Sequence, residues 1–271
     1  MKSIKTFVMA ALAIVMFGFA SCTKETVKPA EKVAGTYEGY TLAASNYFSD
    51  MFTADEKVSV TKVSDNTVKI EFASNSWGSF TIEEALVEGK EAPYKVTGSG
   101  KCKMTAMGSE EREYDCTVEA MINGNGSDVM TFSLPSVMGG TTLSFKQGAA
   151  PVCYYVAGKY EGILSYGVME MDEIEASVEL KAKGGDKVDI VVPAIGEGMM
   201  SIPEITVADI TVSTTDNKLF AIAETEINQT VNNTNYTGTL NGTVDNGTLT
   251  LNFTLKPGAM PMSINFTFVG N

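Results

Sequence analysis

The sequence contains no histidine. This absence excludes catalytic triads that use an imidazole base and zinc sites that are built on histidine pairs. Basic residues are also scarce, because 20 Lys and Arg face 33 Asp and Glu, which gives a net charge of −13. Nucleic acid and anionic membrane surfaces are therefore poor partners, since both require clustered positive charge.

The apolar run at the N-terminus is too short to cross a membrane comfortably. It covers residues 7–20, which follow a basic start and carry no charge. This pattern is typical of a secretory signal peptide. The run ends in Phe19-Ala20-Ser21-Cys22, which resembles the lipobox of bacterial lipoproteins with Phe in place of the usual Leu. We expect residues 1–21 to be the signal peptide, Cys22 to be the lipidated first residue, and residues 22–32 to be a tether; an ordinary cleavage site with an incidental cysteine is the alternative.

The residues directly after Cys22 bear on the location of the protein. Thr23-Lys24-Glu25 resembles the short Lys-acidic export tag of Bacteroidetes lipoproteins, with one acidic residue in place of two. The resemblance implies an outer membrane lipoprotein that is exposed at the cell surface. An anchor that faces the periplasm remains the alternative.

A seven-residue phrase occurs twice in the remainder of the chain. It reads VAGTYEG at 33–39 and VAGKYEG at 156–162, and the apolar positions that follow also recur: Val58, Val60 and Val68 return 120 residues later as Val178, Leu180 and Val188. Such a period indicates an internal duplication. We expect two domains, 33–148 and 156–271, joined by a short linker at 149–155.

Each domain reads as short strands that are separated by turn residues. Apolar and polar residues alternate along most of them, which is the pattern of a half-buried strand. In the first domain the expected strands are 35–42, 57–63, 67–72, 79–87, 94–104, 113–122, 130–134 and 141–146. Connections this short join antiparallel neighbours, and about eight strands in sequence order can close on themselves. The predicted fold is all-β, with two tandem eight-stranded antiparallel up-and-down barrels.

The residues at the two ends of each domain resemble a known family. Gly35-Thr36-Tyr37-Glu38-Gly39 and Gly158-Lys159-Tyr160-Glu161-Gly162 open the domains, and Leu143-Ser144-Phe145 and Ile264-Asn265-Phe266 lie in the closing strands. They are similar to the calycin-like β-barrel family of Bacteroidetes lipoproteins. Lipocalins, which are calycins proper, open with Gly-x-Trp, and Tyr37 and Tyr160 stand here in place of that Trp. The resemblance implies a lipocalin-like barrel that binds a ligand.

Three cysteines remain if Cys22 carries the lipid. Cys102 and Cys116 are symmetric about Ser109 in an expected turn, so a hairpin folded there would place them opposite each other. In an exported protein this arrangement favours a disulfide, and two free core cysteines are the alternative. Cys153 is expected to be a buried thiol in the linker.

No motif of a metal site or a cofactor site is present. The acidic clusters at 110–113 and 170–175 lack the spacing of an EF-hand loop, so solvated charge is their expected role. We expect no enzyme, no metal and no cofactor. A hydrolase that uses carboxylates alone is a remote alternative.

The connection between the first two strands is unusually apolar. It contains Tyr47, Phe48, Met51 and Phe52, spaced as one face of a short helix. In an up-and-down barrel this connection and the loop of Trp77, the only tryptophan, open at the same end. These five residues are the candidate ligand contacts, and a plug for the barrel core is the alternative.

The sequence thus indicates a non-catalytic, lipid-anchored envelope protein. Its expected partners are the membrane, through the lipid, and a small apolar molecule or an envelope or host component. A structural or adhesive module with filled barrels is the alternative.

The anchor gives a first prediction. Replacing Cys22 with Ser removes the acylated atom, so the protein should move from the membrane fraction to the soluble fraction. Immunoblots of the two fractions measure this shift. A Cys22→Ser protein that stays as firmly membrane-bound as its parent would contradict the lipoprotein interpretation.

Overall fold

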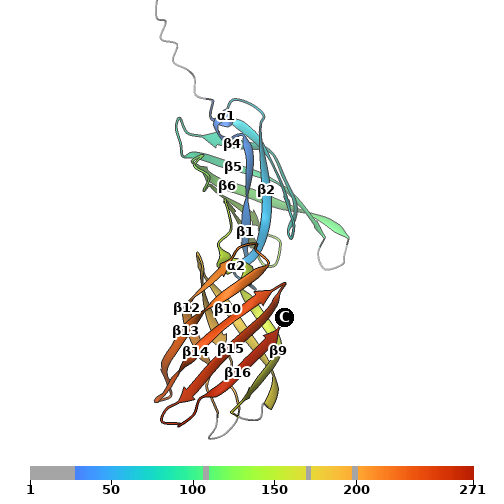
Figure 1. Ribbon diagram of the computed structural model, residues 1–271. Coiled ribbons are helices and arrows are strands. Elements are labelled where there is room, and N and C mark those ends of the chain that lie inside the picture. Colours follow the sequence, from blue (N-terminus) through green and yellow to red (C-terminus); the bar gives the residue numbers. More distant parts are fainter. Residues whose placement is uncertain (1–27, 106–109, 169–171, 197–200) are drawn as a thin grey trace, which may run out of the picture.

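The chain forms two closed antiparallel barrels in tandem. The computed structural model describes residues 28–105, 110–168, 172–196 and 201–271 (Figure 1). The first barrel contains, in sequence order, β1 (Gly35–Ala44), β2 (Met51–Lys62), β3 (Thr67–Ser74), β4 (Gly78–Glu88), β5 (Tyr94–Thr105), β6 (Glu111–Ile122), β7 (Val129–Leu134) and β8 (Thr141–Gln147). The second contains β9 (Gly158–Gly167), β10 (Asp172–Gly184), β11 (Lys187–Val192), β12 (Ile205–Thr214), β13 (Leu219–Val231), β14 (Thr234–Asp245), β15 (Thr248–Pro257) and β16 (Ile264–Gly270). The predicted fold class is confirmed.

Each barrel closes because its last strand pairs with its first. Thr41 of β1 lies opposite Phe145 of β8, and Leu164 of β9 lies opposite Phe268 of β16. Closure leaves no strand edge free to pair with another chain. The predicted strands agree with the observed ones except in β2, which begins at Met51 and not at Lys57, because residues 51–53 still pair with β1.

A one-turn helix precedes each barrel, and the sequence analysis predicted neither. Helix α1 (Pro29–Val33) lies in the expected tether, and α2 (Val152–Val156) lies in the expected linker. The backbone N–H of Ala30 donates to the carbonyl of Asp65 at 3.2 Å, and that of Cys153 donates to Gly185, also at 3.2 Å. Each helix thereby closes the barrel end where the second and third strands meet, which we call the helix end.

The tyrosine of each repeated phrase fixes its helix in place. The Tyr37 hydroxyl donates to the carbonyl of Val33 at 2.7 Å, and the Tyr160 hydroxyl donates to the carbonyl of Val156 at 2.9 Å. Both tyrosines are buried. The repeated phrase therefore marks the contact between a barrel and its helix.

Side chains fill the barrel interiors. In the first barrel, Phe72 lies 5.3 Å from Phe80 and 5.0 Å from Phe132, measured between ring centroids. A separate void of about 10 Å³ lies among apolar side chains that include Val33 and Ile70. A water needs ~10–15 Å³ and polar partners, so this void is too small and too apolar for a ligand. In the second barrel, Phe253 and Phe266 stack at 4.6 Å.

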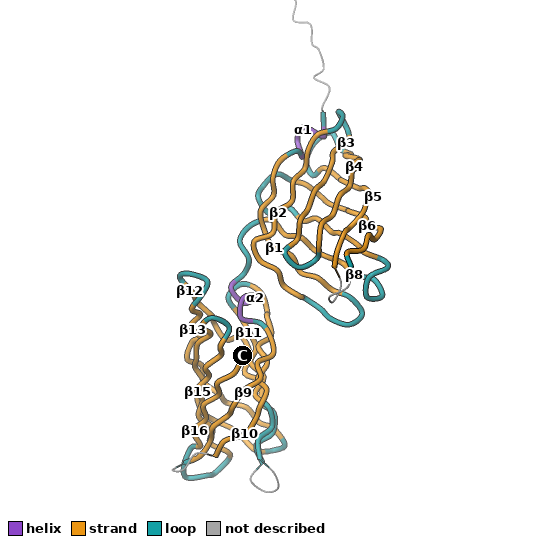
Figure 2. The backbone as a smooth tube through the Cα atoms, turned by 90° about the vertical axis from the view of Figure 1, so that its right-hand side faces the viewer, coloured by secondary structure: helices purple, strands orange, loops and turns teal. Residues whose placement is uncertain are grey.

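The two barrels follow one another along the molecule. Figures 1 and 2 show α1 at the far end of the first barrel and α2 at the junction between the two barrels. The first barrel therefore has its helix end away from the second barrel. Its opposite end carries the β1–β2, β3–β4, β5–β6 and β7–β8 connections.

The helix contact gives a second prediction. Tyr37→Phe removes the hydrogen bond but keeps the ring, and it leaves the buried Val33 carbonyl without this donor. The free energy of unfolding should fall by about 1–3 kcal/mol. Denaturant titration measures the change, and Tyr47→Phe is the matched control because Tyr47 is 80% exposed. Equal effects of the two substitutions would show that the Tyr37 bond does not hold α1.

Candidate binding site at the mouth of the first barrel

An apolar depression occupies the end of the first barrel that lies opposite its helix end. We call it the mouth, and it has a volume of about 580 Å³. All four connections at this end, or the strand ends next to them, contribute to its lining. The lining residues are Tyr47, Phe48, Met51, Ser76, Trp77, Met104, Thr105, Tyr114, Ser136, Val137 and Met138.

Four of the five predicted contact residues lie in the mouth. Tyr47 is the most exposed of them, and Met51 is 51% exposed. The rings of Phe48 and Trp77 pack against each other, with their centroids 5.6 Å apart and their planes tilted by 32°. Trp77 itself is buried, so it forms the floor of the depression and not its rim. The rule that alternate connections open at the same end therefore predicted the shared position of these residues correctly.

The β1–β2 connection does not form the expected helix. Its backbone N–H at Ser45 donates to the carbonyl of Phe48 at 2.9 Å, and the amide group of Asn46 donates to the carbonyl of Gly139 at 3.2 Å. Asp50 has a φ of 52°, a left-handed conformation in which a helix cannot continue. The connection is a short turn that is tied to the β7–β8 connection, and β2 starts at once after it.

Phe52 is the predicted contact that the structure places elsewhere. Because β2 starts at Met51, side chains alternate from there and Phe52 points to the outer face of the barrel. Its ring centroid lies 5.7 Å from that of Tyr154 and 5.0 Å from that of Tyr155, both in α2. Tyr40 joins the same group, 6.0 Å from Tyr154. Phe52 therefore does not share the mouth with the other four predicted residues, and it packs the first barrel against the start of the second.

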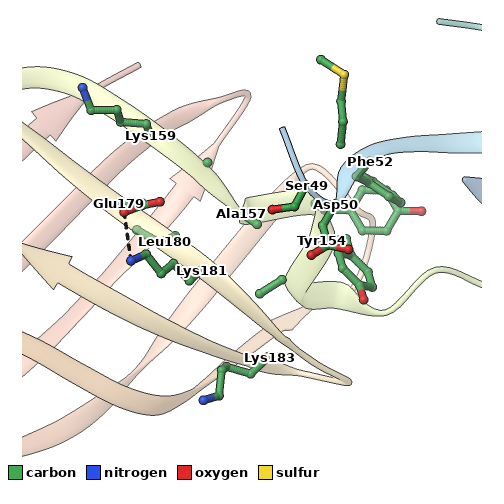
Figure 3. Close-up of a pocket in the computed structure, with 14 residues that line it drawn as sticks. Ser49, Asp50, Phe52, Tyr154, Ala157, Lys159, Glu179, Leu180, Lys181 and Lys183 are labelled. Atoms are coloured by element: carbon green, nitrogen blue, oxygen red, sulfur yellow. Dashed lines mark ion pairs between the residues drawn. The ribbon is translucent and has the colours of Figure 1, made fainter. Parts of the chain in front are cut away.

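A second depression lies between the two barrels. It has a volume of about 780 Å³, and Figure 3 shows Phe52 and Tyr154 at one side of it and Lys159, Lys181 and Lys183 on strands of the second barrel. Each of these lysines has an acidic partner: Lys181 lies 3.3 Å from Glu179, Lys183 lies 3.3 Å from Asp189, and Lys159 pairs with Glu161. The lysines of this groove are thus already paired, and the more apolar mouth is the better candidate site.

Each of the two barrels matches a known protein family. The family model of the calycin-like beta-barrel domain matches residues 33–146 and again residues 156–271. The chain belongs to this family. The expected resemblance is confirmed for both copies.

One solved structure resembles the calycin-like chain over most of its length. It is a protein from Bacteroides fragilis, provisionally named an outer membrane protein, with 32% identity and a TM-score of 0.80, and the match covers 90% of this chain and 99% of that one. A protein of unknown function from Nostoc punctiforme is 10% identical over 92% of this chain and 99% of its own, with a TM-score of 0.26. None of the curated proteins matches the chain.

The predicted disulfide of the first calycin-like barrel is not formed. Strand β5 pairs with β6 so that Cys102 lies opposite Tyr114 and Cys116 lies opposite Gly100. The hairpin register is thus two residues away from the one expected around Ser109, and the two cysteines are diagonal neighbours. Cys102, Cys116 and Cys153 are all buried free thiols. The burial of Cys153 confirms its prediction.

The sequence analysis missed several residues of the calycin-like mouth. Met104 and Tyr114 lie at the ends of the β5–β6 hairpin, and Val137 and Met138 lie in the β7–β8 connection. The signal was available, because these connections open at the same end as that of Trp77. Cys22 and most of the expected tether lie outside the described residues. Within the residues that are described, no helix combines the length and the apolar composition that a membrane crossing requires.

The free thiols give a third prediction. Burial raises the pKa of Cys102 to about 12 and that of Cys116 to about 11, and the thiol of Cys116 adds to the rise at Cys102. At pH 8 roughly one thiol in 10³–10⁴ is then ionised, and only the thiolate is nucleophilic. Iodoacetamide should therefore leave both residues unmodified in the folded protein and alkylate both in denaturant. Peptide mass spectrometry reads the outcome, and a Cys102–Cys116 linked peptide from unreduced protein would contradict the free-thiol state.

Proposed function

We propose that this calycin-like protein is a non-catalytic, lipid-anchored envelope protein whose first barrel binds a small apolar molecule at its mouth. The observation that carries this proposal is the depression between Phe48, Trp77 and the methionines of the mouth. Small-molecule sites are concave and mostly apolar, with a few polar groups that fix orientation. The mouth has this composition, since its polar lining is limited to the hydroxyl groups of Ser76, Thr105, Tyr114, Ser136 and Tyr47.

The side-chain types of the mouth suit a ligand of variable shape. Met51, Met104 and Met138 have unbranched, polarisable side chains that adapt to irregular contacts. The aromatic rings of Tyr47, Phe48 and Trp77 supply large, rigid contact area. A ligand in the mouth would cover Tyr47 and Met138, which are 80% and 43% exposed in the free protein.

The proposed location rests on two supports. The N-terminal sequence has the form of a lipoprotein signal that ends at Cys22. The similar protein from Bacteroides fragilis carries the provisional name of an outer membrane protein. We place this protein at the outer membrane, facing outward, with a periplasm-facing anchor as the alternative.

A structural or adhesive module is the second candidate function. The filled interiors of both barrels favour it, because a barrel of eight strands that is packed with side chains has no room for an internal ligand. In that case the mouth would contact an envelope or host component instead of a small molecule.

Trp77 makes the proposal testable without a label on the protein. Because it is the only tryptophan and lies in the mouth, excitation of Trp77 should transfer energy to N-phenyl-1-naphthylamine as this apolar fluorophore binds. The double variant Tyr47→Ser with Met138→Ser should weaken binding about tenfold, which corresponds to ~1.4 kcal/mol.

The matched control is Met121→Ser with Met262→Ser, which removes two methionines that are 46% and 50% exposed away from the mouth. This control should bind the fluorophore like the parent. The proposed function fails if the parent does not bind the fluorophore, or if the mouth variant and the control bind equally.

A further inference from the structure

A group of polar side chains, all buried except the half-buried Ser74, lies inside the first barrel and adjoins the mouth through the contact of Thr53 with Ser76. It contains Thr41, Thr53, Glu56 and Ser74, which face inward on β1, β2 and β3. Thr41 is 0% exposed, Glu56 is 2% exposed and Thr53 is 8% exposed. We call this group, together with the indole N–H of Trp77, the polar floor.

Hydrogen bonds connect the polar floor to the lining of the mouth. The hydroxyl of Ser74 donates to one carboxyl oxygen of Glu56 at 2.7 Å, and it accepts from the backbone N–H of Trp77 at 3.2 Å. The hydroxyl of Thr53 lies 3.2 Å from that of Ser76, which lines the mouth. The turn at 74–77 thus belongs to both groups.

Three atoms of the polar floor make no hydrogen bond of standard geometry, although the Thr41 hydroxyl lies close enough to the Glu56 carboxyl to lower its pKa. They are the hydroxyl oxygen of Thr41, the second carboxyl oxygen of Glu56 and the indole nitrogen of Trp77. Within the described part of the chain, these are the buried side-chain nitrogen and oxygen atoms that lack a hydrogen bond. Buried polar atoms in native proteins are nearly always bonded, so three such atoms on residues that are linked through Ser74 and Glu56 require an explanation. Together they offer a donor, an acceptor and a hydroxyl that can act as either.

The second barrel shows that the fold does not need these polar groups. Its β9–β10 pairing matches that of β1 and β2: Gly39 lies opposite Glu56, and Gly162 lies opposite Ala176. Two residues further along the first strand of each pair, Thr41 lies opposite Thr53, whereas Leu164 lies opposite Ile174. The same positions are apolar in the second barrel, and Leu164 is 0% exposed. The polar floor is therefore particular to the first barrel.

The backbone differs at the same place. In the first barrel, β2 carries one extra residue between Thr53 and Glu56, a β-bulge at which Asp55 has a φ of 56°. In the second barrel, β9 and β10 pair through this region without a break. A bulge changes the direction of the side chains beside it, and here the Glu56 carboxyl lies next to the Ser74 hydroxyl.

The state of Glu56 suits a shared hydrogen bond. Burial raises the pKa of this carboxyl, while the Ser74 hydroxyl, the backbone N–H of Asn75 and the Thr41 hydroxyl oppose the rise. The carboxyl is thus closer to neutrality than an exposed one would be. In its neutral form it can donate as well as accept.

We propose that the polar floor is the head-group pocket of the mouth, and that it takes the hydroxyl group of an otherwise apolar, aromatic-sized ligand. This inference rests on the proposed function of the mouth and names its ligand class. A ligand hydroxyl can accept from the indole N–H of Trp77 and donate to Glu56 or Thr41, and so supply the missing partners.

Two molecules of equal shape test this inference. 1-Naphthol and 1-methylnaphthalene differ by a hydroxyl in place of a methyl, and each is titrated against protein-bound N-phenyl-1-naphthylamine. The parent should bind 1-naphthol at least tenfold more tightly than 1-methylnaphthalene, because a site built for a hydroxyl leaves its own groups unpaired when the hydroxyl is missing. The double variant Thr41→Leu with Glu56→Ala, which installs the residues of the second barrel, should bind the fluorophore but lose this preference.

A conservative variant and a control complete the test. Thr41→Val keeps the side-chain shape and should reduce the preference even if the double variant does not fold. Glu38→Ala removes a carboxylate whose side chain is 77% exposed on the outer face of β1 and should leave the preference unchanged. The head-group pocket is refuted if the parent binds both naphthalenes equally, or if the preference survives in the floor variants. If the fluorophore itself does not bind the parent, the proposed function of the mouth fails instead.

Discussion

The pairing of the last strand with the first is the constraint on which this protein depends. Each barrel is closed by eight strands, and a barrel of this size is just wide enough for side chains to fill. The phenylalanines of the first barrel occupy this space, and α1 covers one end. At the ends of the first barrel, room for a ligand then remains at the mouth, where four connections meet. Closure therefore determines where function can be located before any side chain of the mouth is considered.

The alternation of apolar and polar residues was sufficient to predict the strands, their order and their closure. It was not sufficient for the helices, because five residues such as 29–33 are too few to show a helical period. It also failed where one residue of register decides the outcome. Phe52 lies outside the barrel because β2 begins at Met51, and Cys102 misses Cys116 because the hairpin register differs by two residues. The shared position of Tyr47, Phe48, Met51 and Trp77 at one barrel end was predicted correctly, because the rule for connection ends does not depend on register.

The duplication provides an internal comparison of two barrels with one fold. Both use a tyrosine of the repeated phrase to hold a short helix, and both pack aromatic side chains inside. They differ where β1 and β2 meet below the mouth, because Thr41 and Glu56 in the first barrel correspond to Leu164 and Ala176 in the second. Unpaired buried polar atoms lower stability, so a stable fold is expected to keep them only where they act. The contacts of Phe52 with Tyr154 and Tyr155 of α2 join the second barrel to the first.

The central claim is that the mouth of the first barrel, and not the second barrel or the groove between them, is where this protein binds. Mapping of amide chemical shifts by NMR tests this claim most directly, with N-phenyl-1-naphthylamine added in steps to the isotope-labelled protein. The account predicts shifts in residues 45–51, 74–78 and 134–141, and none around Tyr154 or Lys181. Shifts that concentrate in the second barrel or around Tyr154 would contradict it.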